Sequence, residues 1–458
     1  MRSPRTVAAF AAITLAGVGL LAGCASSGGG DSADGKVHIT VASLIPGSDK
    51  AAFKAFDDRV KEFEKANPNI VLKTEEYQWT GPTFATQLAG GTLPDVFNVP
   101  FTDSQSLLQA GQLADITPEV KALSYAGKFN ENVLAVAKDG DKIYGIPYGP
   151  YAMGLSYNRE LFAKAGLDPD KPPTTWDEVR EDAKIISQKV PGVAGYMQMT
   201  QGNTGGWELV TTTYARGGRV ETTSGGKTKV TTNNPETKEA LQFLHDVRWE
   251  DNAAGTNFLL DWSGINQAFG AGQIAMYPSG SDVLTSLVQQ NDVDPKNYGL
   301  TTLPLTDNAD AGALVGGNVA AVSPKSTAAQ KAAAVKWIDF YYMQKLLDEK
   351  QAIADAKVLA KSNQPVGVPT LPVFDKATYD QTLSWIKPEV NIPLENVAPF
   401  TDKIFDTNLV PEPNKNTQEL YGALDSVVQA VLTDKNADVD ALLTKVDADI
   451  QKLVDSSK

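Results

Sequence analysis

Apolar side chains near the start of the chain recur with two different spacings. Between residues 37 and 41 they alternate with polar residues, which predicts a strand with one buried face. Between residues 53 and 63 they recur every three or four positions, which puts them on one side of a helix. An Asn-Pro-Asn turn at 67–69 ends this helix, and the apolar run at 70–72 predicts a second strand. A strand, a helix and a strand in this order favour a parallel sheet with helices on its faces.

The alternation of strands and helices continues along the chain. A strand is predicted at 95–99 and a short helix at 104–110, while capping residues followed by acids mark helix starts at 174–178 and 234–236. Longer helices are predicted at 328–342, 420–433 and 439–453. No internal repeat is present, and 458 residues are ample for two hydrophobic cores.

The first residues have the features of an export signal. Arg2 and Arg5 precede an apolar run at 7–21, which is shorter than the roughly 20 residues of a comfortable membrane span. Without residues 1–23 the formal charge changes from −14 to −16. So acidic a surface repels nucleic acid, which is therefore excluded as a partner.

The signal ends at the only cysteine of the chain. The sequence Leu-Ala-Gly-Cys at 21–24 resembles the lipobox of bacterial lipoproteins, and the resemblance implies a signal peptide at 1–23 and acylation of Cys24. Residues 24–35 are small and polar, as in a flexible tether. The expected location is the outer face of the cytoplasmic membrane, at the cell surface or in the periplasm. A single cysteine rules out an intramolecular disulfide and a multi-cysteine zinc site.

Six segments in the body of the chain carry a family pattern. They are 56–68, 88–97 with 111–117, 142–162, 172–179, 268–276, and 298–304 with 315–318. Together, and in this order, they resemble the family 1 extracellular solute-binding proteins, which include the maltose-binding proteins. The last hundred residues match only as generic helices.

The resemblance implies an α/β, two-lobe periplasmic-binding-protein-like fold, with hinge crossings and a ligand cleft between the lobes. The first lobe is expected at 36–149 and 313–362, and the second at 150–312 and 363–458. The crossings are expected near 148–151 and 314–317. Hinge rotation would close the lobes on the ligand. A monomer without cofactor or metal is expected.

The function implied by the resemblance is that of a substrate-binding lipoprotein of an ABC importer. Such a protein is not an enzyme: it binds a sugar or oligosaccharide and delivers it to the permease subunits in the membrane. Sugar C–H faces stack on aromatic rings, and sugar hydroxyls bind carboxylates, amides and backbone groups.

Candidate ligand-binding residues are therefore aromatic, acidic and amide side chains in loops and at the crossings. Among them, Asp103 has an alternative role as the cap of the helix at 104–110. Tyr148 and Tyr151 have an alternative role in packing at the hinge. The candidates are Trp79, Phe101, Asp103, Tyr148, Tyr151, Trp207, Trp262, Asp282, Asn318 and Trp385.

Other functions remain open alternatives. A lipid-anchored glycosidase needs two carboxylates about 5–9 Å apart, which sequence spacing does not exclude. The two histidines, His38 and His245, are expected to be structural, and the chain has no Gly-x-Ser-x-Gly nucleophile motif. A binding protein for a polyamine or a peptide, or a sensor or adhesion lipoprotein, would share the fold and the anchor.

Overall fold

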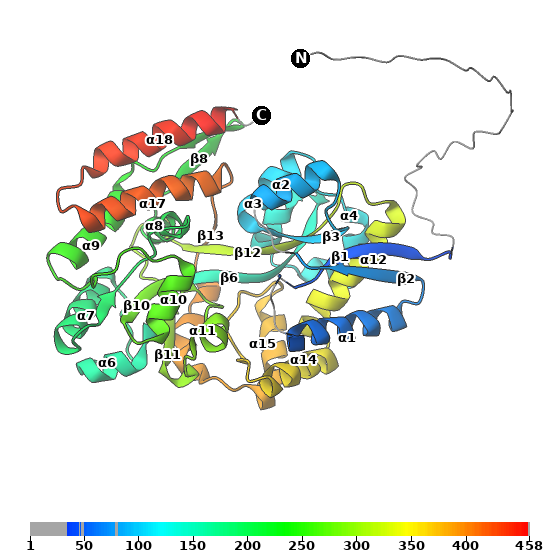
Figure 1. Ribbon diagram of the computed structural model, residues 1–458, viewed down its shortest axis with the longest axis horizontal. Coiled ribbons are helices and arrows are strands. Elements are labelled where there is room, and N and C mark those ends of the chain that lie inside the picture. The colour runs from blue at the N-terminus through cyan, green and yellow to red at the C-terminus, as the bar shows by residue number, and fades with distance from the viewer. Residues whose placement is uncertain (1–33, 45, 47–49, 78–80, 457–458) are drawn as a thin grey trace, which may run out of the picture.

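Two long strands, β6 (Gly145–Asn158) and β12 (Ala313–Val322), run through the middle of the molecule (Figure 1). The computed structural model describes residues 34–458, except 45, 47–49, 78–80, 457 and 458. The two strands pair antiparallel, from Gly145 opposite Ala321 to Ala152 opposite Val315. Beyond Ala152, β6 pairs with other strands, so the pair belongs to both halves of one nine-stranded sheet.

The first lobe is built on three strands beside one end of β12. β1 (Val37–Ala42) is parallel to both β2 (Ile70–Glu75) and β3 (Val96–Pro100), and β3 is antiparallel to β12. Helix α1 (Lys50–Ala66) joins β1 to β2. This unit confirms the strand, helix and strand predicted for 37–72.

The remaining elements of this lobe are mostly short. They are α2 (Gly81–Gly90), α3 (Phe101–Gln109), α4 (Thr117–Lys121), α5 (Glu131–Leu134), the hairpin of β4 (Lys138–Asp139) and β5 (Lys142–Ile143), α12 (Ala328–Ile338), α13 (Gln344–Leu347) and α14 (Glu349–Lys361).

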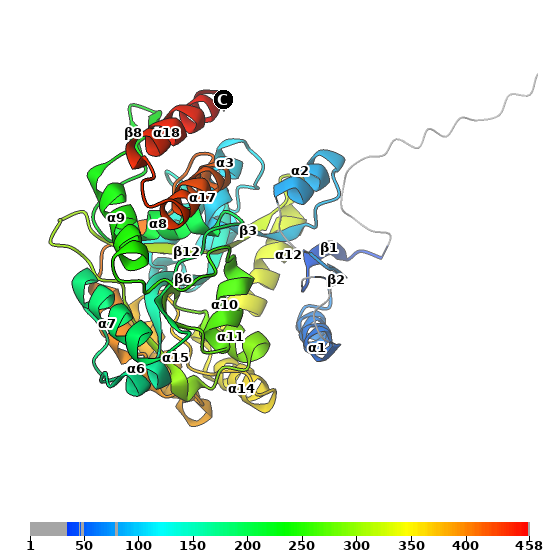
Figure 2. The same cartoon turned by 60° about the vertical axis from the view of Figure 1, so that its left-hand side comes forward.

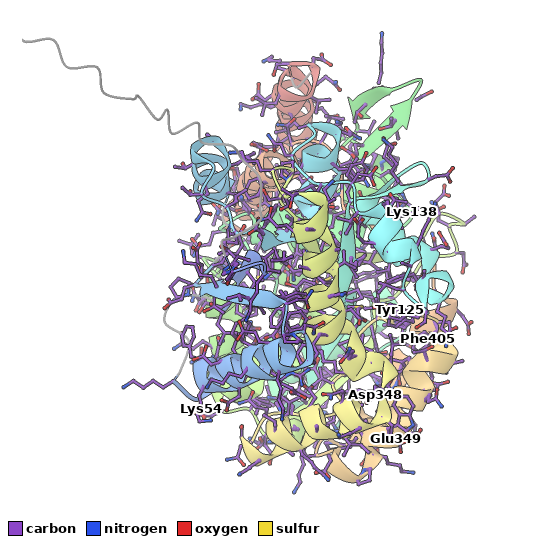
Figure 3. All side chains as sticks on the ribbon, turned by 90° about the vertical axis from the view of Figure 1, so that its right-hand side faces the viewer. Lys54, Tyr125, Lys138, Asp348, Glu349 and Phe405 are labelled. Atoms are coloured by element: carbon purple, nitrogen blue, oxygen red, sulfur yellow. The ribbon has the colours of Figure 1, made fainter. Side chains whose placement is uncertain are left out.

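Aromatic side chains hold the core of the first lobe together. Trp337 of α12 meets Phe56 and Phe63 of α1 edge-on, with ring centroids 5.9 and 5.3 Å apart. After α12 the helix widens into a π-helical turn at Asp339–Met343, where the Asp339 carboxylate accepts a hydrogen bond from the Tyr125 hydroxyl. Tyr125 is labelled in Figure 3. Trp337 thus has the core role expected from its helix.

The second lobe is built on the other end of β6. β10 (Ile274–Gly280) and β11 (Tyr298–Thr302) both lie antiparallel to it, and β7 (Ala194–Tyr196) is parallel to β10. β13 (Leu409–Pro411) adds a short parallel strand beside the start of β12. Chain segments from 145 to 411 therefore meet in one sheet, and local sequence patterns do not predict these pairings.

Helices and one hairpin cover this sheet. They are α6 (Arg159–Ala165), α7 (Trp176–Lys189), α8 (Thr204–Tyr214), the hairpin of β8 (Glu221–Ser224) and β9 (Lys227–Val230), α9 (Pro235–Trp249), α10 (Trp262–Gly270), α11 (Leu284–Asn291), α16 (Ala398–Thr401), α17 (Thr417–Thr433) and α18 (Val439–Ser456).

Helices α8 and α17 are packed unusually close. They lie next to each other in Figures 1 and 2, although they are far apart in the sequence. A Cβ at Gly206 of α8 would overlap the backbone of Tyr421 of α17, so only glycine fits there. The Asp425 carboxylate of α17 accepts hydrogen bonds from the backbone N–H groups of Asn203 and Gly206, at 2.7 and 2.8 Å. The start of α8 is therefore fixed by α17.

Most predicted helix starts are confirmed, and one is not. Thr175 caps α7 in a capping box with Glu178, and Asn234 caps α9. Helix α3, however, begins at Phe101 rather than at 104. Pro100, with φ of −61° and ψ of 153°, is the extended residue before it. Asp103 therefore lies in the first turn of α3 and does not cap it.

The lobe boundaries remain predictions. Helix α15 (Lys376–Ile386) packs on α13 and α14, and Val373 and Phe374 lie in the first core, whereas Ile392 lies in the second. The segment after 363 therefore contacts both lobes. Among the described helices, none has the length and apolar character needed to cross a bilayer.

Replacing Gly206 with alanine should destabilise the protein by about 1–3 kcal/mol, because the new methyl group pushes α8 away from α17. Urea unfolding of the wild type and the variant measures this difference. Gly127→Ala is the matched control, because no atom lies within 4 Å of a Cβ there. Equal losses for both variants would contradict the close packing of the two helices.

Candidate functional site

A cavity of about 320 Å³ opens where the two lobes meet. Pro100 and Thr102 line it from the first lobe, and Gly317 lines it from β12. The second lobe supplies most of the remaining wall, from the start of α8, the start of α10, the end of β10, and the segment from β13 into α17. Four aromatic side chains and two carboxylates stand among the lining residues: Tyr151, Trp207, Trp262, Tyr421, Asp282 and Glu412.

Tyr151 lies at the crossing on β6, in a space that glycines leave free. A Cβ at Gly316 of β12 would overlap its hydroxyl, and a Cβ at Gly280 would lie 3.1 Å from its ring. The pairing of β6 with β12 shifts register between Gly316 and Asn318, so a bulge lies beside the ring. Trp207 meets Tyr151 edge-on, with centroids 6.3 Å apart and planes at 87°. The crossing itself therefore forms one wall of the cavity.

Trp207 is held in place by the anchored start of α8. Asn203 has φ of 69°, in the left-handed region that asparagine tolerates, and its backbone N–H binds Asp425. This turn brings Asn203, Thr204 and Trp207 to the same wall. A rigid turn reduces the entropy that aromatic side chains lose when a ligand binds.

Trp262 is the first residue of α10. The Asp261 carboxylate caps this helix by accepting a hydrogen bond from the backbone N–H of Gly264, at 2.8 Å. The Trp262 side chain is 39% exposed. Since large exposed apolar surfaces are costly, an indole held open at a cavity is typical of a binding surface.

The two carboxylates follow the ends of strands. Asp282 comes two residues after β10, and Glu412 directly follows β13. The Asp282 side chain is exposed at the cavity, and desolvation by the protein around it raises the pKa of its carboxyl to about 6. Glu412 is only 7% exposed. Burial raises the pKa of its carboxyl to about 8, and hydrogen bonds from the Tyr421 hydroxyl and Trp207 side chain oppose this shift.

The cavity has an acidic character without basic partners. No lysine, arginine or histidine is among its described lining residues. Asp103 lies close enough to Glu412 to raise its pKa further by like-charge repulsion. Burial also raises the pKa of Asp103 itself, against a 2.6 Å hydrogen bond from the Thr102 hydroxyl. An anionic ligand would meet repulsion here.

The structure brings four of the predicted site residues together around this cavity. They are Tyr151, Trp207, Trp262 and Asp282. They come from four different elements, β6, α8, α10 and the turn after β10, so their meeting depends on the tertiary fold. That these four residues bind the ligand stays a prediction.

Five predicted residues do not line the cavity. Phe101 packs with Val133, Val136 and Val319 in a small core of the first lobe, directly behind Gly317. Asp103 is half-buried beside Thr102. Three others lie elsewhere: Tyr148 stacks on Tyr342 with centroids 4.0 Å apart, Asn318 pairs with Pro100 across the sheet, and Trp385 is half-buried on α15. Tyr148 therefore makes a packing contact of the kind given as its alternative role, and its role in binding stays a prediction.

Two predictions fall on residues outside the described part of the chain. Trp79 lies in the segment 78–80, and Cys24 lies before residue 34. The signal peptide and all but the last two residues of the tether also fall before residue 34.

Sequence reasoning missed Glu412 and Tyr421, which complete the cavity. Glu412 follows the apolar pair Leu409-Val410 and precedes Pro413, so the end of a short strand was the available signal. Tyr421 lies within an amphipathic helix, where an aromatic residue is typical of the core. No local pattern marks either position. Glu412 reaches the cavity because β13 pairs with β12, and Tyr421 reaches it because α17 packs on α8.

A second hollow, of about 460 Å³, lies on the outer face of α14. Its lining comes from one helix alone, starting at Glu349, which Figure 3 labels. The groove has no aromatic side chain and only one element to position its polar groups. The cavity between the lobes is therefore the better candidate for a binding site.

Comparison with known families gives one match over most of the body of the chain. Residues 47–345 match the family described as bacterial extracellular solute-binding protein. A binding protein of Brucella abortus is 33% identical over 171 residues, which are 37% of this chain and 40% of that protein. The chain therefore matches less than half the length of this curated relative.

Two further relatives carry names that describe a ligand. The multiple sugar-binding protein of Streptococcus mutans is 26% identical over 287 residues, 60% of this chain and 64% of that protein. The sn-glycerol-3-phosphate-binding periplasmic protein UgpB of Brucella abortus is 29% identical over 202 residues, 41% of this chain and 44% of that protein.

Solved structures share the fold over nearly the whole chain. The cyclic alpha-maltosyl-1,6-maltose binding protein from Arthrobacter globiformis superposes with a TM-score of 0.70 at 22% identity. The match covers 92% of this chain and 99% of that structure. The two-lobe periplasmic-binding-protein fold predicted from the sequence is confirmed.

Glu412 should make stability depend on pH. With a pKa of about 8 it keeps its proton in the folded state, whereas the unfolded chain releases it near the ordinary value of 4.5. The folded state then binds more protons between these values, so this stabilisation, complete below about pH 4.5, is lost as the pH rises to about 8. Glu412→Gln has no proton to lose, so its free energy of unfolding should rise relative to that of the wild type as the pH increases through this range. Urea unfolding at both ends of the range measures it.

The matched control for this prediction is Glu395→Gln, which removes an exposed carboxylate. If the wild type and Glu412→Gln lose stability in parallel as the pH rises, Glu412 is ionised in the folded protein and its description as a buried acid is wrong.

Proposed function

The chain belongs to the bacterial extracellular solute-binding proteins, and we propose that it is the substrate-binding lipoprotein of an ABC importer for a sugar or oligosaccharide. The observation that supports this best is the cavity where the lobes meet, with its four aromatic side chains and two carboxylates. The names of the Streptococcus mutans relative and of the Arthrobacter globiformis structure, both of which refer to sugars, support the same class of ligand.

The lining suits the two kinds of surface that a sugar presents. Trp207 and Trp262 offer indole faces to the apolar C–H faces of the rings. Asp282, Glu412 and Asn203 offer oxygen and amide groups to the hydroxyls. Micromolar affinity corresponds to about 8 kcal/mol, which two stacked rings and several hydrogen bonds can supply.

Closure of the lobes is the proposed signal to the permease. Residues of both lobes line the cavity, so a ligand held between them stabilises the closed arrangement. The bulge between Gly316 and Asn318, with Gly317 inside it at φ of 153°, lies at the crossing where the rotation would occur. The permease would then distinguish the loaded from the empty protein by shape.

Catalysis is not part of this function, since the family is non-enzymatic. The histidines have the structural partners expected for them. His38 contacts the Asp34 carboxylate at 3.0 Å, and His245 contacts the backbone carbonyl of Lys435 at 3.1 Å. Neither lines the cavity, so neither could serve a reaction there.

The anchor at Cys24 is part of the proposal. A diacylglyceryl group with an additional acyl chain would hold the protein at the membrane, because each buried methylene contributes about 0.8 kcal/mol. Residues 24–35 would then act as the tether between the membrane and the first lobe.

Trp207→Ala and Trp262→Ala should each weaken sugar binding by about tenfold or more, because each loses a stacking surface. The ligand is found first by thermal unfolding of residues 36–458 against mono- and oligosaccharides, polyamines and peptides, since a ligand at about 100 times its Kd adds roughly 2.7 kcal/mol. Isothermal titration then compares the variants.

Leu453→Ala is the matched control for Trp262→Ala, because Leu453 is also 39% exposed and lies on α18, outside the lining of the cavity. It should leave the affinity unchanged. If both tryptophan variants bind the sugar as tightly as the wild type, the site is wrongly assigned; if the sugar is recovered cleaved, the transport function is wrong.

Cys24→Ser in the full chain should move the protein from the membrane fraction to the soluble exported fraction, because the acylated thiol is lost. Cell fractionation with incorporation of labelled fatty acid measures this. Ser26→Ala, two residues further along, is the control that should stay in the membrane. Retention of Cys24→Ser in the membrane would contradict the lipid anchor.

A further inference from the structure

Three carboxylates gather at the cavity and have no cationic partner among the described residues. Asp282 and Glu412 line it, and Asp103 lies near Glu412. The charged groups that act on Asp103 and Glu412 are other acids, and no charged side chain shifts Asp282. Near neutral pH Glu412 keeps its proton, so the negative charge at the cavity is chiefly that of Asp282, and no basic side chain of the described lining neutralises it.

Some well-buried carboxylates elsewhere in the second lobe have partners, whereas Glu208 accepts one backbone N–H from Met199 and has no basic partner in the described part of the chain. Asp251, whose side chain is 5% exposed, forms ion pairs with Arg180 and, at 3.5 Å, with Lys184. Asp425 accepts two backbone N–H groups at the start of α8. Glu412 differs from Glu208 because it lines a cavity that a ligand can enter, so a ligand can supply the positive charge that the protein does not.

Aromatic rings add to the attraction for a cation. Trp207, Trp262, Tyr151 and Tyr421 line the same cavity, and the face of each ring is the negative end of its quadrupole. Glu412 and Asp282 both raise the pKa of Tyr151, so both carboxylates lie near this one aromatic residue. Rings and carboxylates together form the usual surroundings of a bound ammonium group.

Resting on the proposed function, we propose that the sugar bound in this cavity carries a protonated amine, which Asp282 and Glu412 hold between the aromatic side chains. An ammonium group supplies the positive charge that the protein itself does not place there. A neutral sugar leaves the field uncompensated, and a sugar acid or sugar phosphate adds repulsion to it. The cavity thus selects amino sugars among otherwise similar ligands.

Binding of the amine also changes the protonation of Glu412. The groups that face this carboxyl are Asp103 of α3, Tyr151 of β6, Tyr214 of α8 and Tyr421 of α17, with the Trp207 side chain as a donor. None of these groups is basic, and burial keeps the proton on Glu412 near neutral pH. An ammonium ion beside it favours the ionised carboxylate, so the proton leaves to solvent as the amine binds.

Isothermal titration with matched sugars tests the proposal near neutral pH. The probes are glucose and glucosamine, galactose and galactosamine, and N,N′-diacetylchitobiose and its deacetylated form, with galacturonate as the anion and spermidine as a non-sugar amine. In a pair that binds, the amine should bind about tenfold tighter or more, and added salt should reduce this advantage. Galacturonate should not bind.

Two variants test which carboxylates bind the ammonium group. Glu412→Gln and Asp282→Asn should bring the amine and the neutral sugar to similar affinities, while Asp292→Asn, an exposed change outside the lining, should keep the preference. Titration in buffers of different ionisation enthalpy should detect proton release with the amine for the wild type and none for Glu412→Gln.

The outcomes separate this proposal from the function it rests on. Neutral sugars that bind as tightly as their amino counterparts overturn the amine and leave the sugar-binding function intact. Spermidine binding without any sugar overturns the sugar and supports a cation site. Absence of binding by every probe overturns both.

Discussion

The pairing of β6 with β12 is the constraint on which the rest of the molecule depends. One end of this pair carries the strands of the first lobe and the other end carries those of the second, so these two strands join the lobes. The pair is also where the regular ladder breaks, at the bulge between Gly316 and Asn318. Glycine is required there because Tyr151 and Phe101 fill the space that side chains would need. The same few residues thus join the lobes and form a wall of the cavity.

The cavity contains a buried acid without a basic partner among the residues that the structure describes, which is an unfavourable arrangement. Glu412 is almost fully buried next to Asp103, and the protein provides hydrogen bonds to it but no opposite charge. Such an arrangement lowers stability, and stability is often sacrificed where a binding site needs groups aimed at a ligand. The anchored start of α8 and the capped start of α10 have the opposite effect, because they hold Trp207 and Trp262 before the ligand arrives. The buried acid and the anchored tryptophans therefore lie in the same wall of the cavity.

Much of the fold could be read from local patterns, and the site only in part. The β1–α1–β2 unit and the caps at Thr175 and Asn234 follow from short-range periodicity and capping chemistry, and they are confirmed. Tyr151, Trp207, Trp262 and Asp282 could be selected because loops and strand ends carry polar and aromatic residues to binding sites. Glu412 and Tyr421 could not, because their position depends on the pairing of β13 with β12 and on the packing of α17 against α8. The stacking of Tyr148 on Tyr342 is likewise a tertiary contact that the sequence does not reveal.

The measurement that tests the central claim most directly is a crystal structure of residues 36–458 with the sugar that binds most tightly. The account predicts the ligand between the lobes, with a ring against Trp207 or Trp262 and a polar group on Asp282 or Glu412. It also predicts that the lobes are closer together than in the same crystal experiment without the sugar. A sugar bound on the outer face of one lobe, or a sugar with a broken glycosidic bond in the cavity, would contradict it.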